Sequence, residues 1–152
     1  MPTQNIQPGQ TKEYRKGEFT ISTDRDLIDL DVVHGFLTEC YWAKGIPRDV
    51  VARSIENSLC FGVFAERKQV GFARVISDYA TYAYLGDVFV LESFRGHGLG
   101  KWLMECVLQH PLTAIAPLEL GHPGCSRAIL KAWVRASEEA SKLHGASSPG
   151  RL

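Results

Sequence analysis

The chain has 152 residues, which suits one domain and leaves no room for a second complete core. Its 17 Lys and Arg residues balance 17 Asp and Glu residues, so it has no net positive charge with which to hold a nucleic acid by its phosphates. No apolar run approaches the roughly 20 residues of a membrane-spanning helix, and the N-terminus lacks the apolar stretch of a secretory signal. We therefore expect a cytoplasmic globular protein without nucleic-acid or membrane partners.

The four cysteines are widely spaced, and no two of them form a CxxC pair. Zinc ligands and redox-active cysteines usually occur as such pairs, so the sequence predicts no metal site. Free thiols that pack as small apolar side chains are the expected state of Cys40, Cys60, Cys106 and Cys125.

The N-terminal segment 1–16 is polar, contains two prolines and shows no apolar period, so we expect a disordered tail. Residues 18–23 alternate polar and apolar side chains, which predicts a half-buried strand. Asp24 is of a type that caps helices, and the apolar residues that follow at helical spacing predict a helix to about Tyr41.

A Gly-Ile-Pro break ends that helix, and residues 48–57 predict a second, short one. Residues 59–65 and 70–76 are rich in β-forming types and flank a polar turn at 66–69, which predicts a β-hairpin. The remaining predicted elements are a strand at 84–91 and a helix at 101–109.

Three glycines at alternate positions, Gly96, Gly98 and Gly100, stand between this last strand and helix. Glycine lets the backbone approach an oxyanion, and the N-terminus of a helix presents unpaired N–H groups to it. Because Arg95 and Lys101 add positive charge beside the same turn, we expect a cradle for a diphosphate. A Walker A loop is excluded because tryptophan follows the Gly-Lys pair, and the glycine spacing does not fit the Rossmann fingerprint.

This segment resembles the GCN5-related N-acetyltransferase (GNAT) family. Arg95, Gly98 and Gly100 match the family's RxxGxG pyrophosphate arm, and the predicted elements from Glu18 to Pro111 follow the family's order. The resemblance implies an α/β fold of GNAT type, with a mixed, mostly antiparallel sheet and helices on both faces. It also implies direct transfer of an acetyl group from acetyl-CoA, without a metal, to a primary amine of a small molecule or peptide. Relatives often dimerise, so a homodimer is one expectation.

The resemblance also implies roles for individual residues. In the family, the strand before the arm pairs through its backbone with the pantetheine of CoA, and the arm wraps the diphosphate. The expected cofactor-binding residues are Val88, Phe89, Val90, Arg95, Gly96, His97, Gly98, Leu99, Gly100 and Lys101. Asp87, just before the apolar stretch of the strand, is the expected base, directly or through water. A plain hydrogen-bonding role for Asp87 at the strand end is the alternative.

Aromatic residues next to these positions are the candidates for the acceptor site. The family commonly shapes that site from the end of the first helix and from residues before the cofactor strand. On this basis Tyr41, Trp42, Tyr82 and Tyr84 are expected to bind the acceptor amine. Ordinary aromatic packing in the sheet or at the helix end is the alternative for each of them.

After Pro111 the resemblance stops. The family continues with a strand, a helix that carries a Tyr acid and closing strands, whereas this chain has no comparable β-rich run there. Codons permitted from Pro117 onward, read one base out of frame, can encode RLSLATRDAHGLYSKLGFEPL, which is similar to the C-terminal motif of a bacterial GNAT subgroup. Trp133 and Val134 alone force the glycine of its GF pair. We hypothesise an insertion or deletion near codons 111–116; a genuine, divergent C-terminus is the alternative.

This hypothesis divides the chain into a disordered tail (1–16), a GNAT core (17–111) and an atypical C-terminal segment (112–152). It also keeps a second function open, because the family's Tyr acid is missing. That alternative is a non-catalytic CoA-binding module or an inactivated family member.

Overall fold

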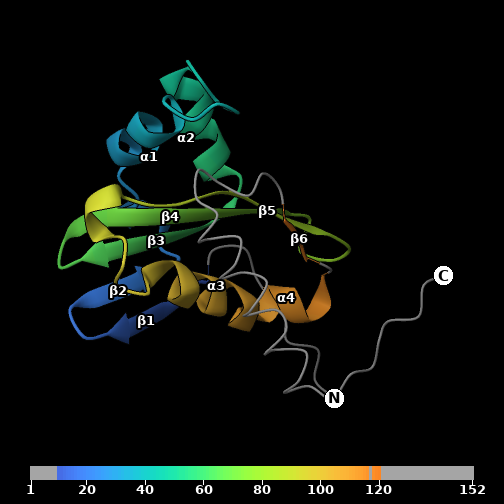
Figure 1. Cartoon of the computed structure of the whole chain (residues 1–152). Helices are drawn as coiled ribbons and strands as arrows, with labels where there is room; N and C mark the ends of the chain where they lie inside the picture. The colour runs from blue at the N-terminus through green and yellow to red at the C-terminus, as the bar shows by residue number, and fades with distance from the viewer. Residues whose placement is uncertain (1–9, 117, 121–152) are drawn as a thin grey trace.

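The computed structural model describes residues 10–116 and 118–120, which form one mixed sheet with helices on both faces (Figure 1). The strands are β1 (Glu13–Lys16), β2 (Phe19–Ser22), β3 (Leu59–Ala65), β4 (Lys68–Ser77), β5 (Ala83–Val90) and β6 (Leu118–Leu120). They lie in the order β1-β2-β3-β4-β5-β6, antiparallel except for the parallel pair β5–β6. The helices are α1 (Leu30–Leu37), α2 (Arg48–Glu56), α3 (Leu99–Gln109) and α4 (Pro111–Ile115), with short 3₁₀ helices η1 (Arg25–Leu27) and η2 (Glu92–Phe94).

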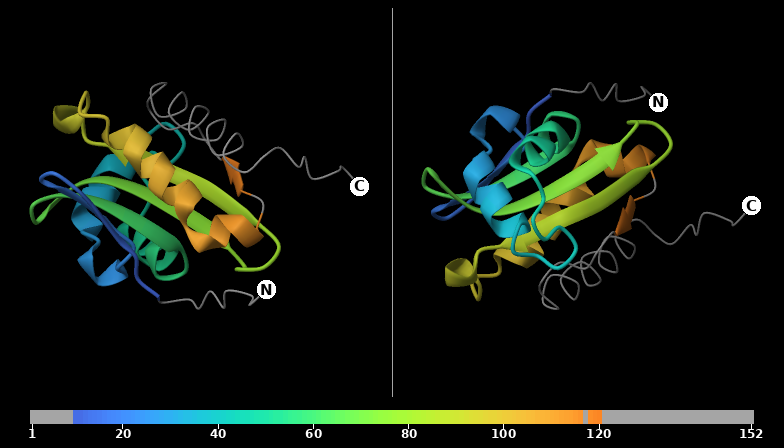
Figure 2. Two further views of the ribbon diagram at one scale, coloured as in Figure 1. Left: turned by 90° about the horizontal axis from the view of Figure 1, so that it is seen from below. Right: turned by 90° about the horizontal axis from the view of Figure 1, so that it is seen from above.

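Two apolar clusters hold the helices against opposite faces of the sheet (Figure 2). On one face, Leu103 and Val107 of α3 pack on Leu85 of β5 within the larger cluster. On the other face, Val33 of α1 and Val51 of α2 belong to the smaller cluster. Each helix buries one apolar stripe, which is the usual way in which amphipathic helices cover a sheet. The predicted fold class is confirmed.

The N-terminal strand corrects the predicted tail. Residues 13–16, which we assigned to disorder, form β1 and pair antiparallel with β2. Gly17, at φ 59, forms the tight turn between the two strands, and Tyr14 packs against the larger core cluster. The segment is mostly polar because β1 is an edge strand, and edge strands bury little. Residues 1–9 lie outside the described part of the chain.

The predicted helix over 24–41 is divided into two pieces. Asp24 caps only η1, through the N–H of Asp26. Asp29 then caps α1, accepting from the N–H groups of Asp31 and Val32, while its own N–H donates to Gln69 Oε1 at 2.7 Å. Each aspartate competes for backbone N–H groups and so starts a new helix. The second aspartate is the reason that the helix is not continuous, and α1 ends at Leu37 rather than near Tyr41.

The other predicted elements are present, with small differences at their ends: the hairpin β3–β4, helix α2, strand β5 and helix α3. The turn of the hairpin is shorter than predicted, because Lys68 and Gln69 belong to β4. Gln69 is buried at 2% exposure, where its side chain accepts from Asp29 and donates to the Gly71 carbonyl oxygen. This buried amide ties α1 to the sheet, which explains why a polar residue stands inside a strand.

The core continues past residue 111. Leu112 and Ala116 are buried in the larger cluster, and β6 follows at 118–120, although no strand was predicted there. At three residues, β6 is too short for an alternation of apolar and polar side chains to identify it. The out-of-frame motif falls mostly on residues 121–152, outside the described part, so the frameshift hypothesis stays a prediction.

His110 caps α4 from a buried position and makes stability depend on pH. Its Nδ1 accepts from the Leu112 N–H at 3.1 Å, and its ring stands edge-on to Phe61. Burial, and next the charge of Lys12, lower the pKa of His110 from 6.5 to about 4. Since the folded state favours the neutral ring, this contribution to stability is complete above pH 6.5 and is lost as the pH falls toward about 4.

We therefore expect the free energy of unfolding to fall by up to about 1.4 kcal/mol per pH unit across that window. Denaturant titrations between neutral and acidic pH measure it. His110→Asn retains a capping side chain without a titrating ring, so its stability should fall less steeply. If the free energy of unfolding changes with pH in the same way in both proteins, His110 is not the cause of the pH dependence.

Candidate active site

Strand β5 contains a β-bulge at Asp87 and Val88. Two of its residues, Asp87 and Val88, face the single residue Ala73 on β4, because the register shifts at this point. Asp87 takes φ 54, a left-handed conformation that Asp tolerates better than most residues but that still costs about 1 kcal/mol. A bulge bends its strand and increases the local twist, so β5 is redirected beyond Gly86.

Beyond this bulge, one edge of β5 has no strand partner among the described residues. Strand β6 pairs only with residues 83–85, so among the described residues no strand lies along that edge of residues 86–90. The side chains of Val88 and Val90 are buried in the larger core cluster, and Phe89 is buried in the smaller one. These three predicted cofactor-binding residues therefore offer only their main chain, which an extended ligand with amide groups can meet as an added strand would.

The glycine turn follows directly. Arg95 folds back so that its Nε donates to the Val90 carbonyl oxygen at 3.1 Å, beside the end of β5. Gly96 and Gly98 take φ 86 and 74, and Gly98 is the N-cap of α3 without any side-chain hydrogen bond to the first turn. A Cβ placed at either glycine would meet no atom within 4 Å, so the space in front of the turn is open. This is the arrangement that binds an anion at a helix N-terminus.

The other residues of the turn differ in which of their groups could face a ligand. Leu99 is buried at 4% exposure, so only its backbone and that of Gly100 can face a ligand. His97 contacts the Phe94 carbonyl oxygen through Nδ1 at 3.1 Å and therefore lies back on the turn. Lys101 is half-exposed, and its ammonium lies 3.9 Å from Glu105, one helical turn further along α3.

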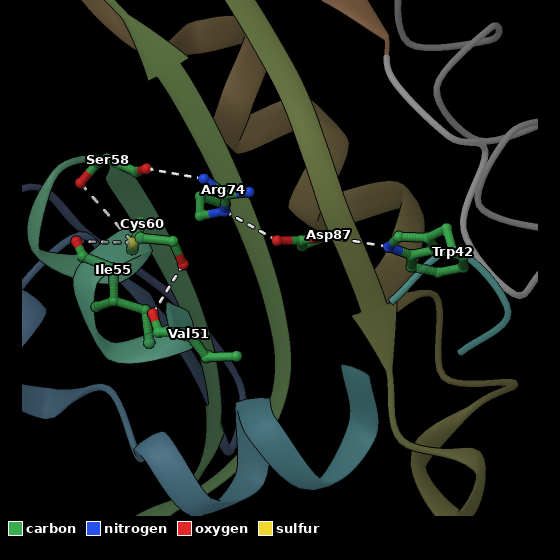
Figure 3. A network of polar contacts seen from close by, with 8 residues as sticks. Trp42, Val51, Ile55, Ser58, Cys60, Arg74 and Asp87 are labelled. Carbon is green, nitrogen blue, oxygen red and sulfur yellow. Dashed lines mark hydrogen bonds and ion pairs between the residues drawn. The ribbon is translucent and has the colours of Figure 1, made fainter. Parts of the chain in front are cut away.

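A polar network crosses the sheet at the bulge (Figure 3). Asp87 Oδ2 accepts from Arg74 Nε at 2.8 Å, and Asp87 Oδ1 accepts from the indole N–H of Trp42 at 3.3 Å. Arg74 also donates from Nη1 to Ser58 Oγ at 3.1 Å. The side chains of Arg74 and Asp87 keep 17% and 13% of their surface exposed, so the pair is largely desolvated but reachable.

Sequence reasoning missed Arg74 and Ser58. The signal for Arg74 was present, because it is the one charged residue within the apolar run 70–76. A charge inside a strand core is usually paired, and its partner here is the predicted base.

The four predicted acceptor aromatics divide into two groups. Trp42 reaches Asp87, and Tyr41, which is 71% exposed, stands edge-on to Trp42 with ring centroids 5.3 Å apart. The ring of Tyr84 lies over Gly86, where a Cβ would come within 3.3 Å of it. Tyr82 instead donates its hydroxyl to Glu119 at 2.7 Å, which links the start of β5 to β6. The structure thus gathers Tyr41, Trp42 and Tyr84 around the bulge and gives Tyr82 a different partner.

A groove of about 440 Å³ runs between α1 and the segment after β5. Phe36 and Leu91 contribute apolar walls, and Arg95 stands beside it. Phe36 also stacks on Phe89 with ring centroids 3.9 Å apart, so the groove adjoins the bulged strand. Asp31 and Glu39 also line the groove, so its charged residues carry both signs, and its apolar walls suit the apolar part of an extended ligand.

Within the described residues, no helix is long and apolar enough to cross a membrane. In the same part of the chain, no three His, Cys, Asp or Glu side chains gather closely enough to hold a metal ion.

A bulged strand with one free edge, leading into a glycine turn that caps a helix, is characteristic of the GNAT-type acyltransferase fold. The comparisons with known proteins agree, because residues 30–142 match the model of the acetyltransferase (GNAT) family. The chain belongs to this family. The match extends beyond residue 111, where the resemblance seen in the sequence ended.

Individual relatives agree with this assignment. A GNAT-family protein of Xanthomonas campestris, known from a crystal structure, is 42% identical, with a TM-score of 0.67 over 86% of this chain and 85% of that one. A curated protein of Gibberella zeae, named "Putative acetyltransferase FG08082", is 28% identical over 62% of this chain. The match spans 64% of that relative, slightly less than two thirds of its length. A GNAT acetyltransferase of Elizabethkingia anophelis, solved with acetyl-CoA bound, shares the fold at a TM-score of 0.56 and 16% identity, over 79% of this chain and 75% of that one.

Proposed function

We propose that this protein is an acetyl-CoA-dependent N-acetyltransferase that moves the acetyl group directly to a primary amine of a small molecule or peptide. The observation that carries the proposal is the free edge of β5 beside the open, uncapped turn at the start of α3. Family membership and the acetyl-CoA bound to the Elizabethkingia anophelis relative support the same donor.

Three parts of the structure support a donor site for acetyl-CoA. The backbone of residues 88–90 would pair with the amide groups of the pantetheine arm, and the groove beside α1 would hold its apolar part. The N–H groups of residues 96–101, with the charges of Arg95 and Lys101, would hold the diphosphate. The thioester would then lie toward the bulge, near Asp87.

The reaction needs a base at that point. The amine lone pair attacks the thioester carbonyl carbon, a C–N bond forms, and the amine loses a proton. The C–S bond breaks with its electron pair on sulfur, and CoA leaves as a thiolate that takes a proton from water. Asp87 is the proposed acceptor of that proton, directly or through water. The hydrogen bonds from Arg74 and Trp42 use one lone pair on each of its oxygens, so each oxygen can still accept from an ammonium.

Calorimetry with acetyl-CoA, combined with a thiol-release assay over a panel of amines, tests this function. We expect saturable binding of acetyl-CoA and release of CoA thiol only when an amine is present. Binding without thiol release would favour the non-catalytic CoA-binding module, and absence of binding would reject both functions. Cytoplasmic location and a homodimer stay predictions, and sequencing the DNA across codons 105–120 decides the frameshift hypothesis.

A further inference from the structure

Arg74 has hydrogen-bond donors that the protein does not use. Its Nε binds Asp87 and its Nη1 binds Ser58, but no acceptor among the described residues binds its Nη2 (Figure 3). The Arg74 side chain is only 17% exposed, so its N–H groups are largely shielded from bulk solvent. The Nη2 group has two N–H donors that no acceptor in the described part of the chain occupies, next to the proposed base, so it can donate to an oxygen of a bound ligand.

The spacing of the two charged groups suggests which ligand supplies that oxygen. Arg74 and Asp87 are only 2.8 Å apart at their closest atoms, and both side chains keep part of their surface exposed. An α-amino acid carries an ammonium and a carboxylate on a single carbon. Its ammonium can therefore meet Asp87 while its carboxylate meets the guanidinium, which recognises carboxylates by charge-assisted hydrogen bonds.

The surface beside the pair is apolar. Arg74 and Gly86 are register partners, and the next partners on the same face are Ile76 and Tyr84. Ile76 is 42% exposed, and Tyr84 lies over Gly86. A side chain that projects from an amino acid bound at Arg74 and Asp87 would cover these two residues, which favours an apolar or aromatic group.

We propose that the acetyl acceptor is an α-amino acid with an apolar or aromatic side chain, and that Arg74 binds its carboxylate. This inference rests on the proposed function, since it names the acceptor of the same site. Arg74 is thereby a specificity-determining residue as well as the partner of Asp87.

Three acceptors of one shape test the proposal: phenylalanine, phenylalaninamide and phenethylamine, compared by kcat/KM in the thiol-release assay. We expect phenylalanine to be preferred over each of the others by about tenfold, because only it has a carboxylate. Arg74→Gln should abolish the preference, and Arg74→Lys should reduce it while retaining the charge. Arg53→Gln is the matched control, since it removes a guanidinium from an exposed ion pair with Asp49 and should leave the preference unchanged.

Equal use of phenethylamine by the unmodified protein, or a preference that survives in a folded Arg74→Gln variant, would overturn the inference. An undiminished preference in Arg74→Lys would overturn it as well. Equal use of the amide would also overturn it, in favour of a peptide amine. Calorimetry of the same compounds with the CoA-loaded protein tests the amino-acid site independently of the proposed transferase function. Selective binding of phenylalanine without thiol release supports the amino-acid site and rejects the transferase function. Thiol release with all three compounds at equal rates supports the transferase function and rejects the amino-acid site.

Discussion

Replacing Gly98 by alanine is expected to weaken acetyl-CoA binding on the order of 100-fold, or about 3 kcal/mol, while the fold is largely retained. Gly98 has φ 74 and is the N-cap of α3. A side chain there costs about 1 kcal/mol of strain, since left-handed backbone disfavours a Cβ. The added Cβ would meet no protein atom within 4 Å, so packing is not disturbed. It would instead enter the space in which the diphosphate approaches the backbone N–H groups, and charge-assisted hydrogen bonds would be lost.

Gly45 supplies a matched control for the backbone. Its φ of 75 nearly equals that of Gly98, and a Cβ placed on it also meets nothing within 4 Å. Gly45→Ala should therefore lower the melting temperature by the same amount as Gly98→Ala and leave the affinity for acetyl-CoA unchanged. Calorimetry and thermal unfolding of both variants provide the comparison. Equal affinities for the two variants would mean that the turn does not hold the cofactor.

The features that could be predicted from the sequence are those that a short segment determines. The turn from Arg95 to Lys101 carries its own glycines, charges and following helix, so its conformation needs no distant contact. The hairpin and α2 were found for the same reason, because apolar periodicity and break residues are local. The predicted main-chain role of residues 88–90 stays a proposal, and the free strand edge that supports it became visible only with the sheet.

The polar network could not be predicted because it depends on the register of the sheet. Arg74 and Asp87 are 13 residues apart, and the bulge at Asp87 decides whether the two side chains share a face. Trp42 is 45 residues from Asp87 and reaches it only through the packing of the segment after α1. For a similar reason the break at Asp29 was missed, because its partner Gln69 belongs to a distant strand. A one-residue change of register between β4 and β5 would separate Arg74 from Asp87.

Replacing Asp87 by asparagine is expected to lower kcat by about 100-fold or more, because general-base catalysis contributes about 10²–10⁴ in rate. Asparagine has the same shape but only one acceptor oxygen, so it can retain the bond to Arg74 or to Trp42 but not both. We therefore expect some loss of thermal stability. Acetyl-CoA affinity should be unchanged, since the Asp87 side chain is not among the groups proposed to hold the cofactor.

The pH dependence of the residual rate separates a base from a purely structural residue. Without a base, the Asp87→Asn variant can use only amine that is already neutral in solution, so its rate should rise about tenfold per pH unit below the pKa of the amine. The unmodified protein should rise less steeply. Asp49→Asn is the control, because it removes a carboxylate from an exposed ion pair with Arg53 and should leave kcat unchanged at every pH. If the rate of the Asp87→Asn variant is lower by the same factor at every pH, Asp87 stabilises the bulge and does not accept the proton. Another group would then be the base.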